Sequence, residues 1–474
     1  MNWTRTGLVA MAACATGCGD NGGGRESDSV SGSATVTVTV TASSGEEVTE
    51  TTPTGSASQT DGTAGSNSAS DTATTTTGVT PTTGGTTAEA TSTGAVSITT
   101  VEPDPSTSTS DGSSTGTPQM DFGDPCGGQG VPDVSYIWIA NSAEGTISKI
   151  NTETLKEEGR YIVRPDSAGS PSRTSVNLTG DVAVANRSGG FTKVYARVDS
   201  CKESNGMPGI QTSTSAAVLP WGVEECVAWY TPFSYQSQRP AAWTPGTFNK
   251  ETCAWENQQV WTSGASDGQL PGIDMVLLNG ETGAIEKQLN VPEIVPAYYG
   301  MYGAAVDKNG NVWASQLSQG SLLFVNKDTL EHKVWPMVAP GYGMTVGSSG
   351  YIWTCSNNAS RFDPMTETWQ TLSVGGSGGC MEDDDGTLYM SGGQNNIVAI
   401  DVETLQVKAT YPLPQYVHGI SIDYYGYVWG VSLGSEAYRV DIANPAAFQT
   451  FTGLVGAYTY SDMTGVALSN VSPQ

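Results

Sequence analysis

The sequence predicts an all-β protein in which residues 122–474 form a β-propeller of seven blades, preceded by a disordered tether. Three observations lead to this prediction. A short motif recurs about every 40 residues in the C-terminal part of the chain. Every aromatic residue except Trp3 lies in residues 122–474. Residues 19–121 consist mostly of Thr, Ser and Gly.

Residues 19–121 are predicted to be a disordered low-complexity linker. They contain no Phe, Trp or Tyr, and Arg25 is their only basic residue. Such a segment buries too little apolar surface to offset the conformational entropy lost on folding. A flexible chain of this length spans roughly 50–60 Å root-mean-square, since the span grows as 5–6 Å times the square root of length.

Residues 1–18 are predicted to be an export signal with a lipid-attachment site. The apolar run Gly7–Ala15 is too short to cross a bilayer and is typical of a secretory signal. The stretch Ala15–Cys18 resembles a bacterial lipobox, which implies that Cys18 carries a lipid; Cys14 is the competing position. We therefore expect an exported protein that is lipid-anchored in the cell envelope, at the outer membrane, at the cell surface or in the periplasm.

Six further cysteines predict three disulfides, because an even number in an exported chain favours pairing. They are Cys126, Cys201, Cys226, Cys253, Cys355 and Cys380. Cys355 ends the second strand of one repeat and Cys380 begins the first strand of the next, so this pair is predicted to be bonded. The other four allow three pairings, among which the sequence does not choose.

The charge and the cysteine spacing exclude several classes of partner. The formal charge of −27, from 47 acidic and 20 basic residues, argues against nucleic acid and against a basic membrane-binding patch. Contact with a membrane is expected through the N-terminal lipid only. No CxxC pair occurs, so a zinc site is not expected, and the sequence indicates neither a metal site nor a cofactor.

The recurring motif is Gly-x3-Asp-x2-Gly-x2-Trp. It is complete at Gly303–Trp313 and Gly419–Trp429, with variants at Gly343–Trp353 and Gly379–Tyr389. The steps between the final aromatic residues are 40, 36 and 40 residues. A period near 40 residues is typical of a propeller blade.

Each repeat is predicted to hold four strands, because Asp/Asn-x-x-Thr follows the motif and favours a hairpin turn. In the fourth repeat the strands are Tyr302–Val306, Val312–Ser315, Leu322–Val325 and His332–Trp335. Second strands are predicted around Trp138, Ala183, Trp261, Trp313, Trp353, Tyr389 and Trp429. The tryptophans at this position are expected to pack between blades.

The ends of the folded part predict how the ring closes. The first strand there, Tyr136–Ala140, is a second strand without a first, and Gly465–Ser469 is left over at the end. We expect Gly465–Ser469 to complete the first blade and remove its free edge. Insertions at Cys201–Cys226 and Pro245–Gln258 distort blades two and three, so six blades is the alternative.

The motif resembles the repeat of streptogramin lyase-like propellers and is similar to NHL and YncE-like repeats. The lyase resemblance implies a histidine at the start of a first strand and a glutamate three residues after the motif tryptophan, which together help to hold magnesium. His418 matches the histidine, but Ser432 stands at the glutamate position. A hard divalent cation favours carboxylate ligands, so the sequence favours a non-enzymatic role.

The candidate ligand-binding residues are expected around one mouth of the central channel, because they begin the first strands or neighbour those starts. They are His418, Tyr302, Tyr342, Tyr299, Arg173, Arg187, Arg239 and Asn186. Aromatic faces with hydrogen-bonding groups suit a sugar or a peptide. The hypothesis is therefore a surface-exposed module that binds protein or glycan. The alternatives are a lyase or hydrolase with its site around His418, and a structural component of the cell envelope.

Overall fold

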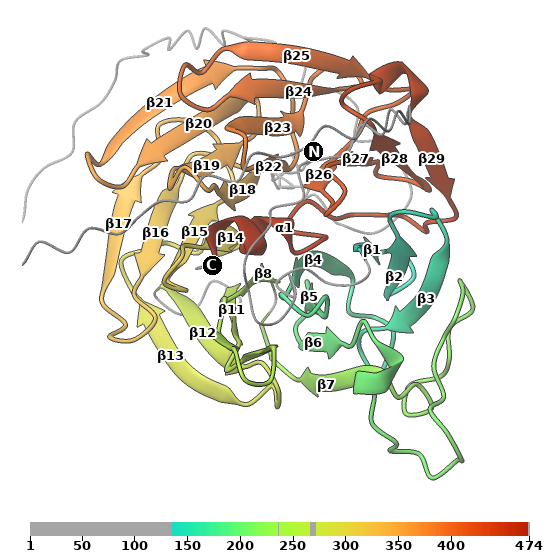
Figure 1. Cartoon of the computed structure of the whole chain (residues 1–474). Helices are drawn as coiled ribbons and strands as arrows, with labels where there is room; N and C mark the ends of the chain where they lie inside the picture. The colour runs from blue at the N-terminus through green and yellow to red at the C-terminus, as the bar shows by residue number, and fades with distance from the viewer. Residues whose placement is uncertain (1–134, 236, 266–271, 473–474) are drawn as a thin grey trace, which may run out of the picture. The chain divides into compact units, whose positions relative to one another are not determined.

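Seven antiparallel sheets are arranged in a ring around a central channel in the computed structural model, which describes residues 135–235, 237–265 and 272–472 (Figure 1). The fold is the predicted seven-bladed β-propeller, not the six-bladed alternative. Blade 1 holds β1 (Tyr136–Asn141), β2 (Thr146–Asn151) and β3 (Glu157–Ile162), and blade 2 holds β4 (Pro171–Val176), β5 (Val182–Asn186), β6 (Phe191–Val194) and β7 (Val227–Thr231). Blade 3 holds β8 (Ser237–Trp243), β11 (Gln259–Ala265), β12 (Ile273–Asn279) and β13 (Ile285–Val291).

The remaining four blades are regular, with the strands of each sheet in sequence order. Blade 4 holds β14 (Met301–Val306), β15 (Val312–Gln316), β16 (Ser321–Val325) and β17 (His332–Pro336), and blade 5 holds β18 (Gly343–Val346), β19 (Ile352–Cys355), β20 (Asn358–Asp363) and β21 (Thr368–Ser373). Blade 6 holds β22 (Cys380–Glu382), β23 (Thr387–Ser391), β24 (Asn396–Asp401) and β25 (Val407–Pro412), and blade 7 holds β26 (Gly419–Ile422), β27 (Val428–Val431), β28 (Glu436–Val440) and β29 (Gln449–Thr452).

The motif aspartate and glycine form the turn between the first and second strands of a blade. In blade 4 the Asp307 carboxylate accepts hydrogen bonds from the backbone N–H groups of Asn309 and Asn311. Gly310 has φ +77°, a left-handed conformation that favours glycine. The same aspartate contacts recur at Asp423 in blade 7. The spacing of the motif is thus the spacing of one turn.

Tryptophans of the second strands pack between blades, as predicted. Trp138 of blade 1 is fully buried and donates its indole N–H to the carbonyl oxygen of Gly180 in blade 2 at 3.1 Å. Trp261 of blade 3 makes the equivalent bond to Gly310 of blade 4 at 3.1 Å. A large buried ring with its N–H bonded to the next blade fixes the angle between neighbouring sheets.

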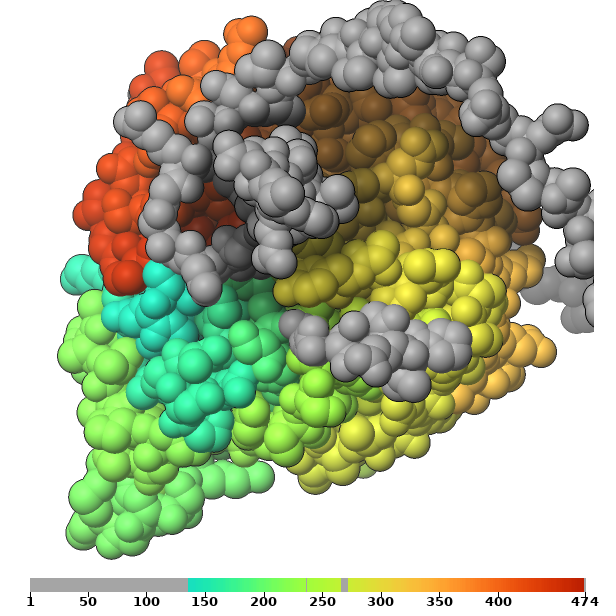
Figure 2. All heavy atoms as spheres, turned by 180° about the vertical axis from the view of Figure 1, so that it is seen from behind, coloured from blue at the N-terminus to red at the C-terminus, as the bar shows by residue number. Residues whose placement is uncertain are grey.

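The ring closes through the segment 456–463, and the predicted closing strand Gly465–Ser469 is wrong. Tyr458 N–H donates to the Ala140 carbonyl at 3.1 Å, and Trp138 N–H donates to the Met463 carbonyl at 2.8 Å. The inner edge of β1 is therefore paired, and Figure 2 shows the first and last blades side by side. The Asp462 carboxylate accepts the N–H groups of Thr464 and Gly465, and this turn ends the extended segment.

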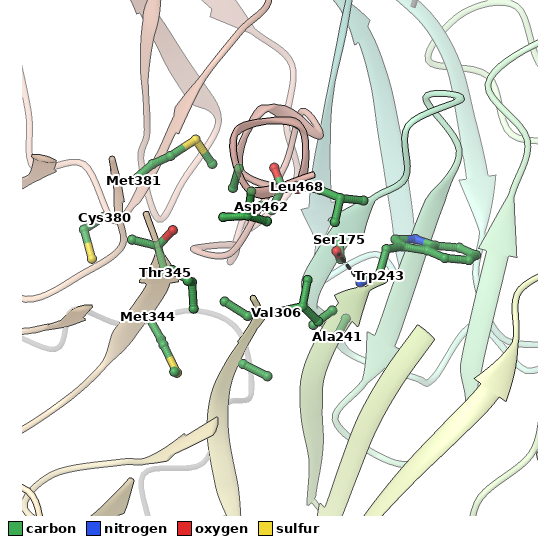
Figure 3. Close-up of a pocket in the computed structure, with 16 residues that line it drawn as sticks. Ser175, Ala241, Trp243, Val306, Met344, Thr345, Cys380, Met381, Asp462 and Leu468 are labelled. Atoms are coloured by element: carbon green, nitrogen blue, oxygen red, sulfur yellow. Dashed lines mark hydrogen bonds between the residues drawn. The ribbon is translucent and has the colours of Figure 1, made fainter. Parts of the chain in front are cut away.

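Beyond that turn, the chain forms the short helix α1 (Val466–Val471) instead of a strand. Leu468 and Val471 point into the central channel, and Asn470 donates to the Glu382 carbonyl at 3.2 Å. A cavity of about 30 Å³ lies between α1 and the inner strands of blades 2 to 6 (Figure 3). This space holds about one water molecule, so α1 closes the channel at the end where the inner strands finish.

Both predicted insertions are present. The chain between β6 and β7 leaves the ring as a loop, visible at the lower right of Figure 1, and the disulfide Cys201–Cys226 ties its two ends together. The hairpin of β9 (Thr247–Asn249) and β10 (Ala254–Glu256) stands between β8 and β11. The predicted disulfide Cys355–Cys380 is present and joins blades 5 and 6. Cys253 is disulfide-bonded as well.

Several predictions fall outside the described residues: the export signal, Cys14, Cys18, the linker and Cys126. Within the described ranges, no helix has the length and apolar character needed to cross a membrane.

Candidate ligand-binding site

The first strands of the blades bring the predicted aromatic residues together at one end of the channel, which we call the channel mouth. Tyr302 lies in β14, and Tyr342 and His418 come directly before β18 and β26. The Tyr342 backbone N–H donates to the Cys355 carbonyl at 2.9 Å, and that of His418 donates to the Val431 carbonyl at 2.6 Å. These bonds to the neighbouring second strand fix where each side chain enters the channel.

Three tyrosine hydroxyls meet at the channel mouth. The Tyr302 hydroxyl lies 3.1 Å from those of Tyr342 and Tyr458, and the latter two are also hydrogen-bonded to each other. Burial raises the pKa of Tyr342 well above its ordinary value, and the neighbouring Tyr302 and Tyr458 add to the rise. Each of the three hydroxyls can both donate and accept hydrogen bonds.

His418 packs within this group of tyrosines. Its ring centroid lies 4.9 Å from that of Tyr342, 5.2 Å from Tyr458 and 5.1 Å from Tyr460. Its Nδ1 is 3.0 Å from the Tyr416 hydroxyl. The imidazole is 5% exposed, so it forms part of the wall of the channel rather than its outer surface.

Three arginines lie over the faces of the tyrosine rings. The guanidinium carbon of Arg173 is 5.0 Å from the Tyr302 centroid, and that of Arg239 is 4.7 Å from the same ring. Arg187 lies 4.7 Å from the Tyr458 ring. All three arginines are buried. Two guanidinium groups therefore share one aromatic ring, an arrangement that stabilises positive charge through the ring quadrupole.

Arg173 is the most deeply buried of the three, with 1% of its surface exposed. Its Nη2 donates to the Tyr342 carbonyl at 3.1 Å, whereas Nε and Nη1 have no hydrogen-bond partner among the described residues. Burial lowers the pKa of Arg173 to about 9; nearby tyrosines oppose the decrease, and Arg239 adds to it. The group remains a cation at neutral pH, in an interior where an unpaired charge is unfavourable.

Two residues of this group, Tyr458 and Tyr460, escape the sequence prediction. Both belong to the closing segment 456–463, and Tyr460 is fully buried. Tyr458 pairs with Ala140 whereas Met463 pairs with Trp138, so the closing segment has more residues than the β1 edge that it covers. The surplus residues bulge and direct Tyr460 towards Arg173, whose guanidinium carbon is 3.0 Å from the ring centroid. Placing the closing strand at residues 465–469 hid both tyrosines.

Of the eight predicted residues, Asn186 has a different environment. Its amide donates to the carbonyls of Val163 and Gly190 at 3.0 and 3.3 Å, so this group stabilises the backbone of blades 1 and 2. The other seven, with the two added tyrosines, make up what we call the mouth cluster. It comprises Arg173, Arg187, Arg239, Tyr299, Tyr302, Tyr342, His418, Tyr458 and Tyr460.

The mouth cluster and its surroundings supply groups suited to ligand recognition. Ser432 donates its hydroxyl to the Glu436 carbonyl at 2.8 Å, so it is engaged with its own turn. Within the described ranges, no group of three or more His, Cys, Asp or Glu residues lies close enough to hold a metal ion. The cluster offers aromatic rings, hydroxyls and guanidinium groups, which are the groups that bind ligands by stacking, hydrogen bonding and charge.

The fold and the mouth cluster define a β-propeller with an aromatic, cationic channel mouth. No protein-family model matches the sequence, and no curated protein matches it. Among solved structures, the chain is similar to catalytically inactive virginiamycin B lyase from Staphylococcus aureus with quinupristin: 14% identity, 60% of this chain and 84% of that chain covered, TM-score 0.41. It is also similar to the dihydro-heme d1 dehydrogenase NirN, with 10% identity, 66% of this chain covered and a TM-score of 0.42. The chain spans 63% of the length of NirN. Both are β-propellers, and the likeness carries no information on ligand or activity.

Proposed function

We propose that this protein is a non-enzymatic, exported binding module that is lipid-anchored through Cys18 and binds a glycan at the channel mouth. The convergence of the mouth cluster is the observation that supports the proposal. Blades 1 to 5 and blade 7 each contribute at least one aromatic or arginine side chain. Independent strands that deliver one kind of chemistry to one place favour a binding site.

Among the described residues, the other end of the channel forms no comparable site. The cavity beneath α1 measures about 30 Å³ and is lined mostly by Ala, Val, Leu and Met side chains. A drug-sized ligand or a sugar needs roughly ten times that volume. We therefore assign ligand binding to the mouth and a structural role to the opposite end.

A screen of sugars and oligosaccharides by thermal shift on the full chain tests this proposal. A ligand that binds at the mouth raises the unfolding midpoint of the wild type and not that of Tyr342→Ala. The matched control is Tyr425→Ala, because Tyr425 is 45% exposed in the turn between β26 and β27, on the opposite face. A ligand that stabilises all three proteins equally binds elsewhere and contradicts the proposal.

An enzyme with its site around His418 is the second candidate, supported by the 3.0 Å contact between His418 Nδ1 and the Tyr416 hydroxyl. A histidine and a tyrosine at hydrogen-bond distance can exchange a proton with a substrate. The same library, assayed for product by mass spectrometry, separates the two candidates. Turnover that disappears in His418→Ala would replace the binding proposal with an enzymatic one.

A further inference from the structure

The ligand chemistry follows from the charge of the mouth cluster. Resting on the proposed function, we propose that the mouth binds an acidic sugar, a hexuronate or a glycan ending in one, and that Arg173 binds its carboxylate. The proposal combines a buried cation with unpaired N–H groups, a second guanidinium beside it, and ring faces and hydroxyls around both.

The unpaired groups of Arg173 are the first observation. Nε and Nη1 are buried without a hydrogen-bond partner among the described residues, and Arg173 as a whole is 1% exposed. A buried charged donor that makes no hydrogen bond costs free energy. A carboxylate is the natural partner, because the planar guanidinium matches its two oxygens in a bidentate pair.

The surroundings of Arg173 supply no such partner from the described chain. The groups that interact electrostatically with it are the tyrosines Tyr302, Tyr342 and Tyr458 and the cation Arg239, and no aspartate or glutamate is among them. The nearby Asp462 carboxylate accepts the backbone N–H groups of Thr464 and Gly465, and so serves the turn before α1. A negative group on the ligand would offset the repulsion between Arg173 and Arg239.

A sugar ring fits the remainder of the mouth cluster better than a peptide acid does. The mouth cluster contains five tyrosine rings, and the hydroxyls of Tyr302, Tyr342 and Tyr458 form one hydrogen-bonded group. The Tyr460 hydroxyl and the Thr459 and Ser461 hydroxyls are also buried without a partner among the described residues. Hydroxyl groups around an aromatic wall are suited to a ring that carries several hydroxyls.

Access to Arg173 requires movement of the Tyr460 ring. The two unpaired nitrogens have almost no accessible surface, and the Tyr460 ring lies against the guanidinium. Tyr460 stands between the closing bonds at Tyr458 and Met463, in chain without regular strand structure, so its ring can shift while those bonds stay in place. Binding of the acidic sugar therefore displaces the Tyr460 ring and exchanges its contact for a charge-assisted hydrogen bond.

Isothermal titration of the full chain with galacturonate and glucuronate, and with galactose and glucose as neutral matches, tests the inference. We expect an affinity at least tenfold higher for an acid than for its neutral match. Arg173→Met should lower acid affinity at least tenfold and leave neutral-sugar affinity unchanged, and Arg173→Lys should retain part of it. Arg164→Met is the matched control, because Arg164 lies on the same face and pairs with the exposed Asp166 at 3.1 Å.

Equal affinity for acid and neutral sugar, no binding of either acid, or an acid affinity insensitive to Arg173→Met would overturn the inference. Tyr342→Ala separates this failure from failure of the proposed function. If it abolishes binding of a neutral sugar that Arg173→Met leaves intact, the mouth is a glycan site without a carboxylate requirement. If an acidic dipeptide binds in place of the sugars, the ligand class is wrong. Unfolding midpoints of every variant show that each is folded.

Discussion

The guanidinium carbon of Arg173 lies 3.0 Å from the centroid of the Tyr460 ring, although the two residues come from β4 and from the segment that closes the ring. The contact brings an inner strand of blade 2 to the chain that completes blade 1. The same residues that close the propeller therefore shape its channel mouth. Changes at Arg173 should affect ligand binding and stability differently.

We expect Arg173→Met to abolish acid binding while lowering the free energy of unfolding by no more than about 1 kcal/mol. A buried cation without an anionic partner is often replaced by an apolar side chain at no cost or with a gain. The loss of one hydrogen bond to the Tyr342 carbonyl acts in the other direction. Urea unfolding measures the difference, and a loss of 3 kcal/mol or more would show that Arg173 is structural.

Leu468→Ala should destabilise the propeller by about 2–4 kcal/mol, because it leaves a cavity where the Leu468 side chain of α1 fills the end of the channel. Leu468 is 4% exposed and lines the channel cavity. Leu433→Ala is the control, since Leu433 is 44% exposed and its truncation should change stability by less than about 0.5 kcal/mol. Equal effects of the two substitutions would mean that α1 does not seal the channel.

The pH dependence of stability should carry the signature of Asp462. Burial raises the pKa of Asp462 from its ordinary value of 3.8 to about 6 in the folded protein. The folded state then holds the proton more tightly than the unfolded chain, so this contribution to stability is full below about pH 4, falls as pH rises to 6, and is absent above.

Asp462→Asn removes that contribution while its amide oxygen still accepts the N–H groups of Thr464 and Gly465. We expect the free energy of unfolding of the variant, relative to that of wild type, to increase by about 1–3 kcal/mol when the pH is raised from 4 to 7.5. Asp385→Asn, at an exposed turn position, should show no such difference. A constant difference between Asp462→Asn and wild type at both pH values would contradict the assignment.

The disulfides Cys201–Cys226 and Cys355–Cys380 provide a matched pair, because each joins cysteines 25 residues apart. Removing either one by a double Cys→Ala substitution should cost about 3 kcal/mol, since the denatured chain gains the same loop entropy. Only the loss of Cys355–Cys380 should also weaken binding at the mouth, because Cys355 holds Tyr342, and Gly379, beside Cys380, donates to the His418 carbonyl at 2.7 Å. Equal ligand binding by the two double Cys→Ala variants would show that the mouth does not depend on the Cys355–Cys380 bond.

The blade architecture follows from local chemistry that the sequence displays. The motif Gly-x3-Asp-x2-Gly-x2-Trp predicts the blade repeat because its aspartate and glycine make one turn. The tryptophan at the equivalent strand position packs on the next blade, as Trp261 does. The Cys355–Cys380 bond follows from the same register. Each of these features depends on residues close together in the chain or at equivalent positions of adjacent repeats.

The sequence predicts that the C-terminal segment completes the first blade, but it does not predict which residues pair, because the closure depends on non-local pairing. Residues Gly465–Ser469 match the start of a repeat, yet the Asp462 turn ends the extended segment and α1 follows. The closing bonds lie several residues earlier, at Tyr458 and Met463. Tyr458 and Tyr460 were consequently missed, and they are the residues that bring the candidate site together. A short segment with one bulge carries no periodic signal.

Hydrogen–deuterium exchange of the full chain, with and without galacturonate, tests the central claim most directly. A ligand at the mouth should slow exchange in peptides covering residues 171–176, 342–346, 416–422 and 456–463, and leave the turn at residues 364–367 unchanged. Arg173→Met should abolish the protection. Protection confined to the outer strands or to the opposite face, or none at a concentration that saturates binding, would contradict the claim that the channel mouth is the ligand site.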